Sequence, residues 1–228
     1  MQFRNLGSRI ATEILKRISP VHYKNREELA YWRDRFSQEG GDLRRGHYEE
    51  FYTTFFGLTR ADYAGKRVLD IGCGPRGSLE WIAAEAECFG VDPLVEQYRA
   101  LGIDRHRMKY VHAGVEAMPF PSGHFDFVAS FNNLDHVDDL AQAVAEIQRV
   151  TAPGGTFLLI TEVEHTPTPT EPHFLPRTIA HRFEPEFEVQ SQGLCALNEA
   201  HDIYGSLRER QDYREGGDGI VFARMTRR

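Results

Sequence analysis

The sequence predicts an α/β protein with a doubly wound, mostly parallel sheet. From residue 65 onward, short apolar runs alternate with segments of helical character, an order typical of parallel strands joined by crossover helices. The run at 156–163 has almost no polar break, as expected for a strand buried on both faces. With 228 residues, 41% of them hydrophobic, one substantial core and a single domain over residues 1–228 are expected.

The central part of the chain, residues 65–163, is expected to hold five strands and three helices. The strands are predicted at 66–72, 87–92, 109–115, 124–131 and 156–163. The helices are predicted at 77–86, 93–102 and 138–155. The last helix is the best marked, because an apolar stripe lies between a capping residue and a Pro-Gly-Gly stop. The apolar stripe consists of Leu140, Val144 and Ile147, and the cap is Asp138 or Asp139. The stop consists of Pro153, Gly154 and Gly155.

The two flanks differ from this core. Residues 1–64 are aromatic-rich with helical character and are expected to form a cap. Residues 164–186 read as a loop rich in proline and threonine, and closing strands are predicted at 187–197 and 219–228. In sheets of this kind, ligands bind beyond the carboxyl ends of the strands, where the cap and the late loops would close over them.

Residues 1–19 show apolar side chains at helical spacing with basic residues around them. Such a helix can lie on a membrane surface, or it can pack on its own domain or on a second subunit. The packing interpretation is favoured, so a homodimer formed through this helix is one expectation. Stable membrane insertion is not expected, because no apolar run reaches the length of a membrane span.

Charge and cysteine content limit the partners and the compartment. The formal net charge of -7 and the pI near 5.8 argue against nucleic acid as a partner. The three cysteines form no C-x-x-C pair, so neither a zinc site nor a disulfide framework is indicated. The sequence therefore predicts a cytoplasmic protein.

The stretch "DIGCGPRG" at 70–77 has the glycine spacing of a dinucleotide-binding turn, and Asp92 follows where a ribose-binding acid belongs. Asp70 conflicts with a dinucleotide, because a unit charge about 4 Å from a pyrophosphate charge costs about 4 kcal/mol at an effective dielectric of about 20. S-adenosylmethionine has an ammonium, a sulfonium and no phosphate, so it suits Asp70. Alternatively, Asp70 caps the turn through its own backbone.

These segments together resemble the class I S-adenosylmethionine-dependent methyltransferases. "VLDIGCGPRG" is similar to their first motif and "GVDP" to their second. "VHAGVEAMPFPSGHFDFVASFNNLDHVDD" and "EIQRVTAPGGTFLLIT" are similar to the later blocks of small-molecule members. The similarity runs in order over residues 66–163. It implies a seven-stranded, Rossmann-like sheet and S-adenosylmethionine as cofactor, with S-adenosylhomocysteine as product.

The resemblance also implies site residues. Asp70 would meet the methionine ammonium, Asp92 the ribose hydroxyls and Leu94 the adenine. The cofactor-binding residues it implies are Asp70, Gly72, Gly74, Asp92, Leu94, Val115, Glu116 and Phe131. The aspartate that usually meets the adenine amino group is replaced by Gly114, so that contact is missing or comes from Glu116.

On the acceptor side, Asp135 replaces the first histidine of the family's L-H-H-V pair and leaves His136 as the candidate catalytic base. A histidine suits proton transfer at neutral pH, because its ordinary pKa is about 6.5. His165 and His173, in the loop after the fifth strand, are weaker candidates. No metal is expected: Asp135, Asp138 and Glu162 could hold one together, but their spacing matches no metal motif.

The expected function is methyl transfer to a small or medium organic acceptor, with O- or N-methylation favoured. "SFNNLD" after the fourth strand lacks the D/N-P-P-Y/F motif of nucleobase and glutamine N-methyltransferases. Two alternatives stay open. One is an NAD-dependent oxidoreductase, supported by the literal glycine spacing, and the other is a protein that binds the cofactor without catalysis or acts on a macromolecule.

Overall fold

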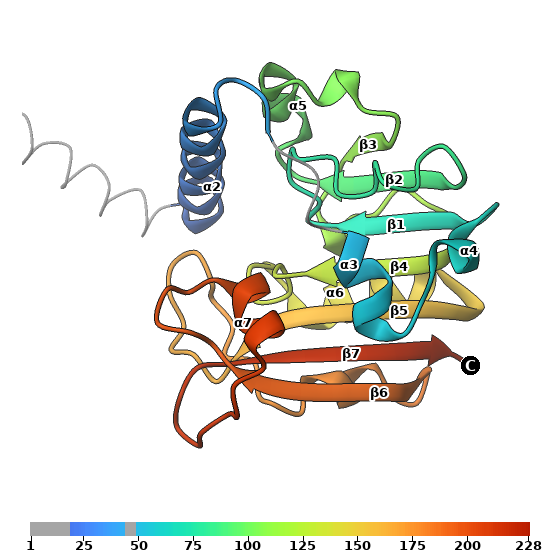
Figure 1. The fold of residues 1–228 in the computed structure, drawn as a ribbon, viewed down its shortest axis with the longest axis vertical. Helices are drawn as coiled ribbons and strands as arrows, with labels where there is room; N and C mark the ends of the chain where they lie inside the picture. The colour runs from blue at the N-terminus through green and yellow to red at the C-terminus, as the bar shows by residue number, and fades with distance from the viewer. Residues whose placement is uncertain (1–18, 44–48) are drawn as a thin grey trace, which may run out of the picture.

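The computed structural model describes residues 19–43 and 49–228 and contains a seven-stranded sheet in the order β3-β2-β1-β4-β5-β7-β6 (Figure 1). All neighbouring pairs are parallel except those that involve β7, which runs antiparallel to β5 and β6. The strands are β1 (Arg67–Ile71), β2 (Glu87–Asp92), β3 (Lys109–His112), β4 (Phe125–Phe131), β5 (Thr151–Val163), β6 (Phe187–Ala196) and β7 (Gly219–Arg227). The mostly parallel, seven-stranded sheet is as predicted.

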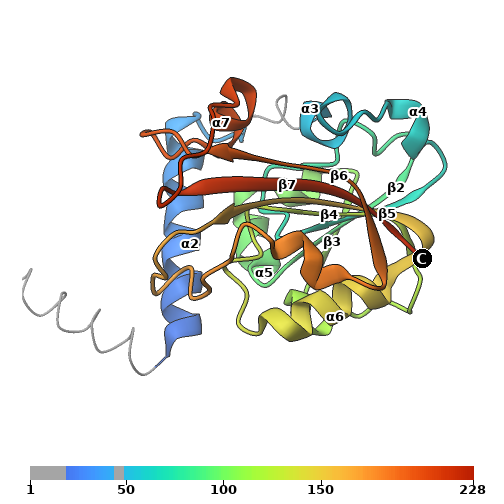
Figure 2. The ribbon, with the colours of Figure 1, turned by 90° about the horizontal axis from the view of Figure 1, so that it is seen from below.

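Helices cover both faces of the sheet. α6 and the short helical turn at Ile179–Phe183 lie on one face, and α3, α4 and α7 lie on the other (Figure 2). The α-helices are α2 (Pro20–Gln38), α3 (Glu49–Tyr52), α4 (Arg60–Tyr63), α5 (Val95–Tyr98), α6 (Leu140–Val150) and α7 (Ile203–Glu209). Each face of the sheet has its own cluster of buried apolar side chains, so β1, β4 and β5 are covered on both sides. This double coverage explains their nearly continuous apolar sequences.

The order of the strands creates a switch point between β1 and β4. The chain adds β2 and β3 on one side of β1, then crosses over to place β4 on the other side. At such a point, the connections leave the sheet in opposite directions and open a crevice beyond the carboxyl ends of the strands. β1 and β2 end at this crevice with Ile71 and Asp92.

All three helices predicted for the core differ in the structure, and the one predicted at 93–102 is divided into α5 and a 3-10 turn at Arg99–Leu101. The segment 77–86 forms consecutive turns, because its backbone hydrogen bonds are mostly of the i→i−3 type, such as Ile82 N to Leu79 O at 3.1 Å. Its two fully buried residues, Leu79 and Ile82, are themselves three residues apart, which suits this tighter winding. The predicted 138–155 helix starts after an Asp139 cap but ends at Val150, where β5 begins at once.

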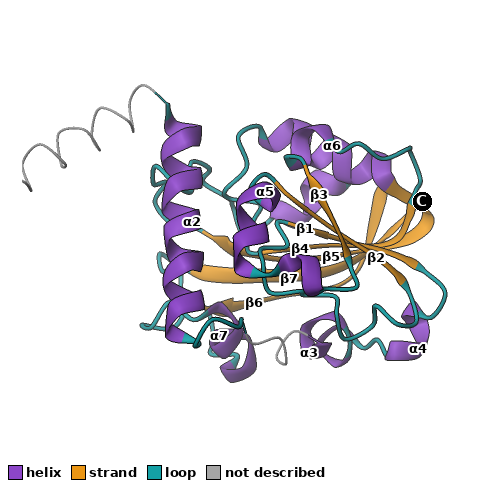
Figure 3. Ribbon diagram, turned by 90° about the horizontal axis from the view of Figure 1, so that it is seen from above, coloured by secondary structure: helices purple, strands orange, loops and turns teal. Residues whose placement is uncertain are grey.

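α2 crosses the carboxyl ends of the strands, as the view from above shows (Figure 3). The helix expected over 1–19, and with it the expected dimer contact, falls almost entirely outside the described residues. Within the described ranges, no helix has the length and apolar character needed to cross a membrane.

Candidate active site

A cavity of about 620 Å³ lies beyond the carboxyl ends of β1, β2 and β4. α2, the segment 113–116, the loop 132–138 and side chains from the C-terminal third complete its wall. A volume in this range suits a ligand of cofactor size with room for an acceptor. Eight of the nine predicted site residues line it: Asp70, Gly72, Asp92, Leu94, Val115, Glu116, Phe131 and His136.

Asp70 stands at the end of β1 with 4% of its surface exposed. Its carboxylate accepts a short hydrogen bond from the Ser78 hydroxyl, and the Tyr52 hydroxyl, which also favours the charged carboxylate, is nearby. Burial nevertheless dominates and raises the pKa of Asp70 to about 7. Since hydroxyls are its partners rather than a cation, Asp70 is ready to pair with a cationic ligand.

Asp92 ends β2, the strand next to β1, and is 7% exposed. Each carboxylate oxygen accepts one backbone N–H: Oδ1 from Leu94 at 2.8 Å and Oδ2 from Gly74 at 3.1 Å. These bonds fix the orientation of the carboxylate and leave lone pairs for ligand hydroxyls. Burial raises the pKa of Asp92 to about 7 despite the two N–H donors.

The glycine turn brings backbone and side chains together at close range. Gly72 and Gly74 both have positive φ, +67° and +55°. A Cβ on Gly72 would lie 2.4 Å from the Asn133 amide, and one on Gly74 would lie 2.9 Å from the Trp32 ring. Gly74 is the predicted site residue that does not line the cavity. It lies beneath Trp32 of α2 and acts through its N–H to Asp92.

Glu116 occupies the space that a side chain at position 114 would need. A Cβ on Gly114 would lie 2.8 Å from Glu116 Oε2. Glu116 Oε1 accepts the backbone N–H of Asp138 at 2.7 Å and so ties the loop after β4 to the cavity wall. The second oxygen, Oε2, is the one next to Gly114. The Glu116 carboxylate therefore lies beside Gly114, and its contact with adenine stays a prediction.

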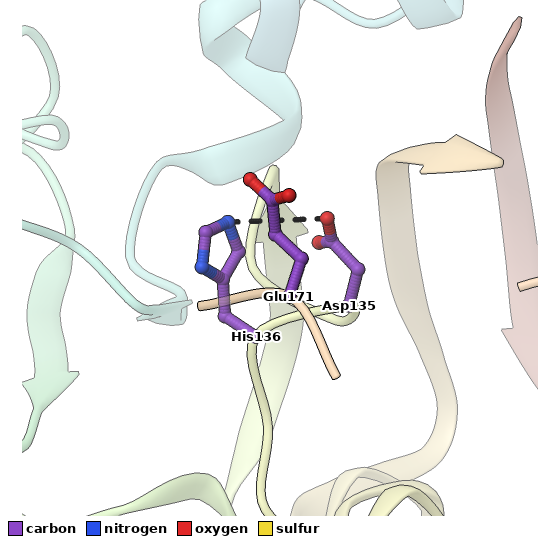
Figure 4. Close-up of side chains that lie close together, drawn as sticks. All are labelled: Asp135, His136 and Glu171. Carbon is purple, nitrogen blue, oxygen red and sulfur yellow. Dashed lines mark ion pairs between the residues drawn. The ribbon is translucent and has the colours of Figure 1, made fainter. Parts of the chain in front are cut away.

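On the acceptor side, Asp135, His136 and Glu171 come together, and their side chains point toward a shared space (Figure 4). Their ligand atoms lie within 4.8 Å of one another. Asp135 is 1% exposed, and its Oδ2 lies 3.9 Å from His136 Nε2 and 3.5 Å from His165 Nε2. The carboxylate raises the pKa of His165 to about 9.

Glu162 of β5 belongs to the same acidic neighbourhood. Its burial, with added repulsion from Asp135 and Glu171, raises its pKa to about 7. Asp138, by contrast, is half-exposed and pairs with Lys24 at 2.6 Å. In the described part of the chain, the group that gathers is Asp135, His136 and Glu171, rather than the trio with Asp138 and Glu162 considered from the sequence.

His173 and Lys24 fix the loop that carries His136. His173 Nε2 donates to the Val137 carbonyl at 2.9 Å, and Lys24 Nζ donates to the His136 carbonyl at 2.7 Å. His173, a weaker candidate base, is therefore occupied in holding this loop. Lys24, which holds the same loop from the other side, belongs to α2.

The sequence did not identify the part of α2 that faces the cavity. Trp32 and Arg35 line it, and Glu39 beyond the end of α2 binds Arg76 with two hydrogen bonds, of 2.5 and 2.9 Å. The Arg76 guanidinium also lies 5.5 Å from the centre of the Trp32 ring. The only signal in the sequence was the aromatic helical stretch itself, which names no partner.

Comparisons with known proteins agree with this geometry. Residues 69–159 match the family described as a methyltransferase domain. A probable tocopherol O-methyltransferase, chloroplastic, of Oryza sativa subsp. japonica is 32% identical over 124 residues, which are 51% of this chain and 34% of that protein. A ubiquinone biosynthesis O-methyltransferase of Aromatoleum aromaticum is 39% identical over 110 residues, 44% of this chain and 46% of that protein. The structure of a geranyl diphosphate methyltransferase in complex with GPP and sinefungin aligns with a TM-score of 0.58 at 20% identity, over 79% of this chain and 76% of that one.

The sheet order and the cavity at its switch point define a Rossmann-like protein of the methyltransferase type. Residues 69–159, which carry the glycine turn, Asp70 and Asp92, match the methyltransferase domain family and are similar to the corresponding segments of these two O-methyltransferases. The matched segments span less than half the length of the two curated relatives.

Proposed function

We propose that this protein binds S-adenosylmethionine in the cavity and transfers its methyl group to a small or medium organic acceptor, at oxygen or nitrogen. The cofactor would lie across the ends of β1 and β2, with its ammonium at Asp70 and its ribose at Asp92. Leu94, Val115 and Glu116 would surround the adenine, and Phe131 would face the methionine end.

The observation that carries the proposal is the pair of buried carboxyl groups at the ends of β1 and β2. Asp70 and Asp92 both have pKa values of about 7, because burial disfavours their charged forms. A ligand with an ammonium group offsets that cost, whereas a pyrophosphate would increase it. The methyltransferase family match over 69–159 favours the same ligand over NAD.

Methyl transfer is an in-line displacement at the sulfonium carbon, and holding the acceptor in line can supply several kcal/mol. An O–H or N–H acceptor must also lose a proton. We propose His136 as the catalytic residue on this side, because its ring lines the cavity beside Asp135. In the simplest chemistry, the imidazole takes the proton directly.

A turnover screen tests this proposal. Labelled S-adenosylmethionine is incubated with the protein and pools of phenols, alcohols, carboxylic acids and amines, and the label is expected to move to one class. For that acceptor, His136→Ala should lower turnover by about a hundredfold, the usual contribution of a positioned proton acceptor, with little change in cofactor affinity.

The screen also addresses the remaining alternative. A protein that binds cofactor without catalysis, or that acts on a macromolecule, would leave every pool unlabelled. A His136→Ala variant that keeps full turnover would show that positioning alone suffices. The cytoplasmic location and the dimer expected from the sequence stay predictions.

A further inference from the structure

We propose that Asp135, His136 and Glu171 bind one divalent metal ion on the acceptor side of the cavity, and that the ion holds an oxygen acceptor. This rests on the proposed function and narrows its substrate class. The three side chains come from two segments that are distant in sequence, the loop after β4 and the loop after β5, and converge in one place (Figure 4).

The separations suit a single ion. Donor atoms bound to one ion at about 2.1 Å lie at most about 4.2 Å apart. Three donor atoms around one tetrahedral ion lie about 3.4 Å apart, and the three here lie within 4.8 Å of one another, so an ion would draw them together by up to about 1.4 Å. One imidazole nitrogen and two carboxylates are ligands that manganese, iron and zinc ions accept.

An independent observation comes from the hydrogen bonding of Asp135. Its side chain is 1% exposed, yet Oδ1 is buried with no hydrogen-bond partner among the described residues. His165 Nε2 pairs with the other oxygen, Oδ2, at 3.5 Å, so this ion pair leaves Oδ1 without a partner there. Buried polar atoms rarely stay unpaired, because each costs about 1–3 kcal/mol. A metal ion bound through Oδ1 removes that cost, which the His165 pair at Oδ2 does not.

The neighbouring contacts hold the proposed ligands in place without occupying them. Lys24 binds the backbone carbonyl of His136 and leaves its ring free to face the cavity. Thr168 donates its hydroxyl to Glu171 Oε2 at 3.0 Å, which orients the carboxylate as a partner behind a metal ligand does. Both interactions fix the position of a proposed metal ligand and leave a donor atom of that residue available.

Three protein ligands leave coordination positions open for the acceptor. Two adjacent oxygens, as in a vicinal dihydroxy compound or a hydroxy-carbonyl compound, would fill them best. When an acceptor O–H binds the ion, its proton leaves to water more readily. The oxygen lone pair then forms the O–CH₃ bond while the S–CH₃ bond breaks, and that electron pair stays on sulfur. His136 is a metal ligand in this mechanism rather than a free base.

The direct test is metal binding without any substrate. Protein without a histidine tag is freed of metal with EDTA and titrated with Mn²⁺, followed by electron paramagnetic resonance and calorimetry. We expect one Mn²⁺ per chain. Asp135→Asn and Glu171→Gln should each weaken binding at least tenfold, since each removes a charged ligand. Asp104→Asn, an exposed carboxylate paired with Arg99, is the matched control and should bind as the wild type does.

Glu171→Gln decides the matter if the buried Asp135 variant does not fold, because Glu171 lies on a partly exposed loop. The proposal is overturned if the wild type binds neither Mn²⁺ nor Zn²⁺, or if Glu171→Gln binds Mn²⁺ as tightly as the wild type. Titrating the same metal-free protein with S-adenosylhomocysteine separates the two proposals. Binding of that ligand without metal binding leaves methyl transfer standing, with His136 as the base for an oxygen or nitrogen acceptor.

Discussion

At the scale of single residues, Asp70 and Asp92 are the most informative groups in the chain. They are buried at the ends of neighbouring strands, and both have a raised pKa of about 7. A carboxyl group whose pKa is higher in the folded protein stabilises the fold at low pH, and that contribution is lost as pH rises from about 4 to about 7. The cofactor, by contrast, needs the ionised forms.

We therefore expect S-adenosylhomocysteine binding to release protons near pH 6–7. Its affinity should rise by up to about tenfold per pH unit for each proton released, and level off above about pH 8. Calorimetry in two buffers of different ionisation enthalpy measures the release. Asp70→Asn should bind more weakly and with a flatter pH profile, whereas Asp104→Asn should match the wild type. A pH-independent affinity in the wild type would contradict this assignment of the two acids.

Residue-level prediction worked best where the spacing was short. Asp70 and Asp92 lie in two strands that pair directly, and Gly72 follows the first of them, so the local sequence already places all three at one edge. Glu171 could not be found this way, because it comes from a loop without periodicity and reaches the site through the fold. Glu116 was inferred from the absence of a side chain at Gly114, and the structure puts its carboxylate beside that glycine.

At the scale of elements, α2 is held by two kinds of contact: Leu29, Trp32 and Phe36 pack against an apolar cluster around α5, and polar contacts lie at both ends of the helix. Every residue of α2 is at least partly exposed. Lys24 holds one end to the loop after β4, and Glu39 just beyond the other end binds Arg76, with both side chains of that pair at most 16% exposed. The sequence predicted helical character here but not the partner, since periodicity reports an apolar face and not charged anchors at the ends.

This arrangement makes α2 a cover whose closure can be weakened without disturbing the sheet. We expect Glu39→Gln to destabilise the closed position of α2 by about 1.5–3 kcal/mol, because Arg76 keeps its charge and loses the Glu39 carboxylate. Hydrogen exchange over 20–38 should speed up, and S-adenosylhomocysteine should dissociate at least about tenfold faster. The matched control is Glu27→Gln on the same helix, whose exposed pair with Arg26 contributes little.

The prediction for α2 would be wrong if Glu39→Gln changed neither hydrogen exchange nor cofactor dissociation, or if Glu27→Gln changed both equally.

The segment 77–86 shows a second limit of prediction at the scale of elements. Its sequence has helical character, yet the backbone forms turns whose hydrogen bonds are mostly of the i→i−3 type, with Leu79 and Ile82 buried in the core. Whether a short segment completes a helix depends on packing that the local sequence does not contain.

At the scale of the whole molecule, the sheet order explains why distant segments meet in one cavity. Parallel strands β1, β2 and β4 end on one side, and α2 and the loop after β5 close over that side. The alternation of strands and helices predicted the parallel part, and the resemblance implied seven strands. The cavity's full wall depends on contacts across more than a hundred residues, such as Lys24 with Asp138, which no local pattern reveals.

The central claim is that this cavity binds the methyltransferase cofactor and not a dinucleotide. The most direct measurement is a pair of calorimetric titrations of the purified chain, one with S-adenosylhomocysteine and one with NAD. We expect S-adenosylhomocysteine to bind one per chain with a Kd of about 1 μM or below, which corresponds to about −8 kcal/mol or better, and NAD to give no measurable heat. Binding of NAD together with no response to S-adenosylhomocysteine would contradict the account.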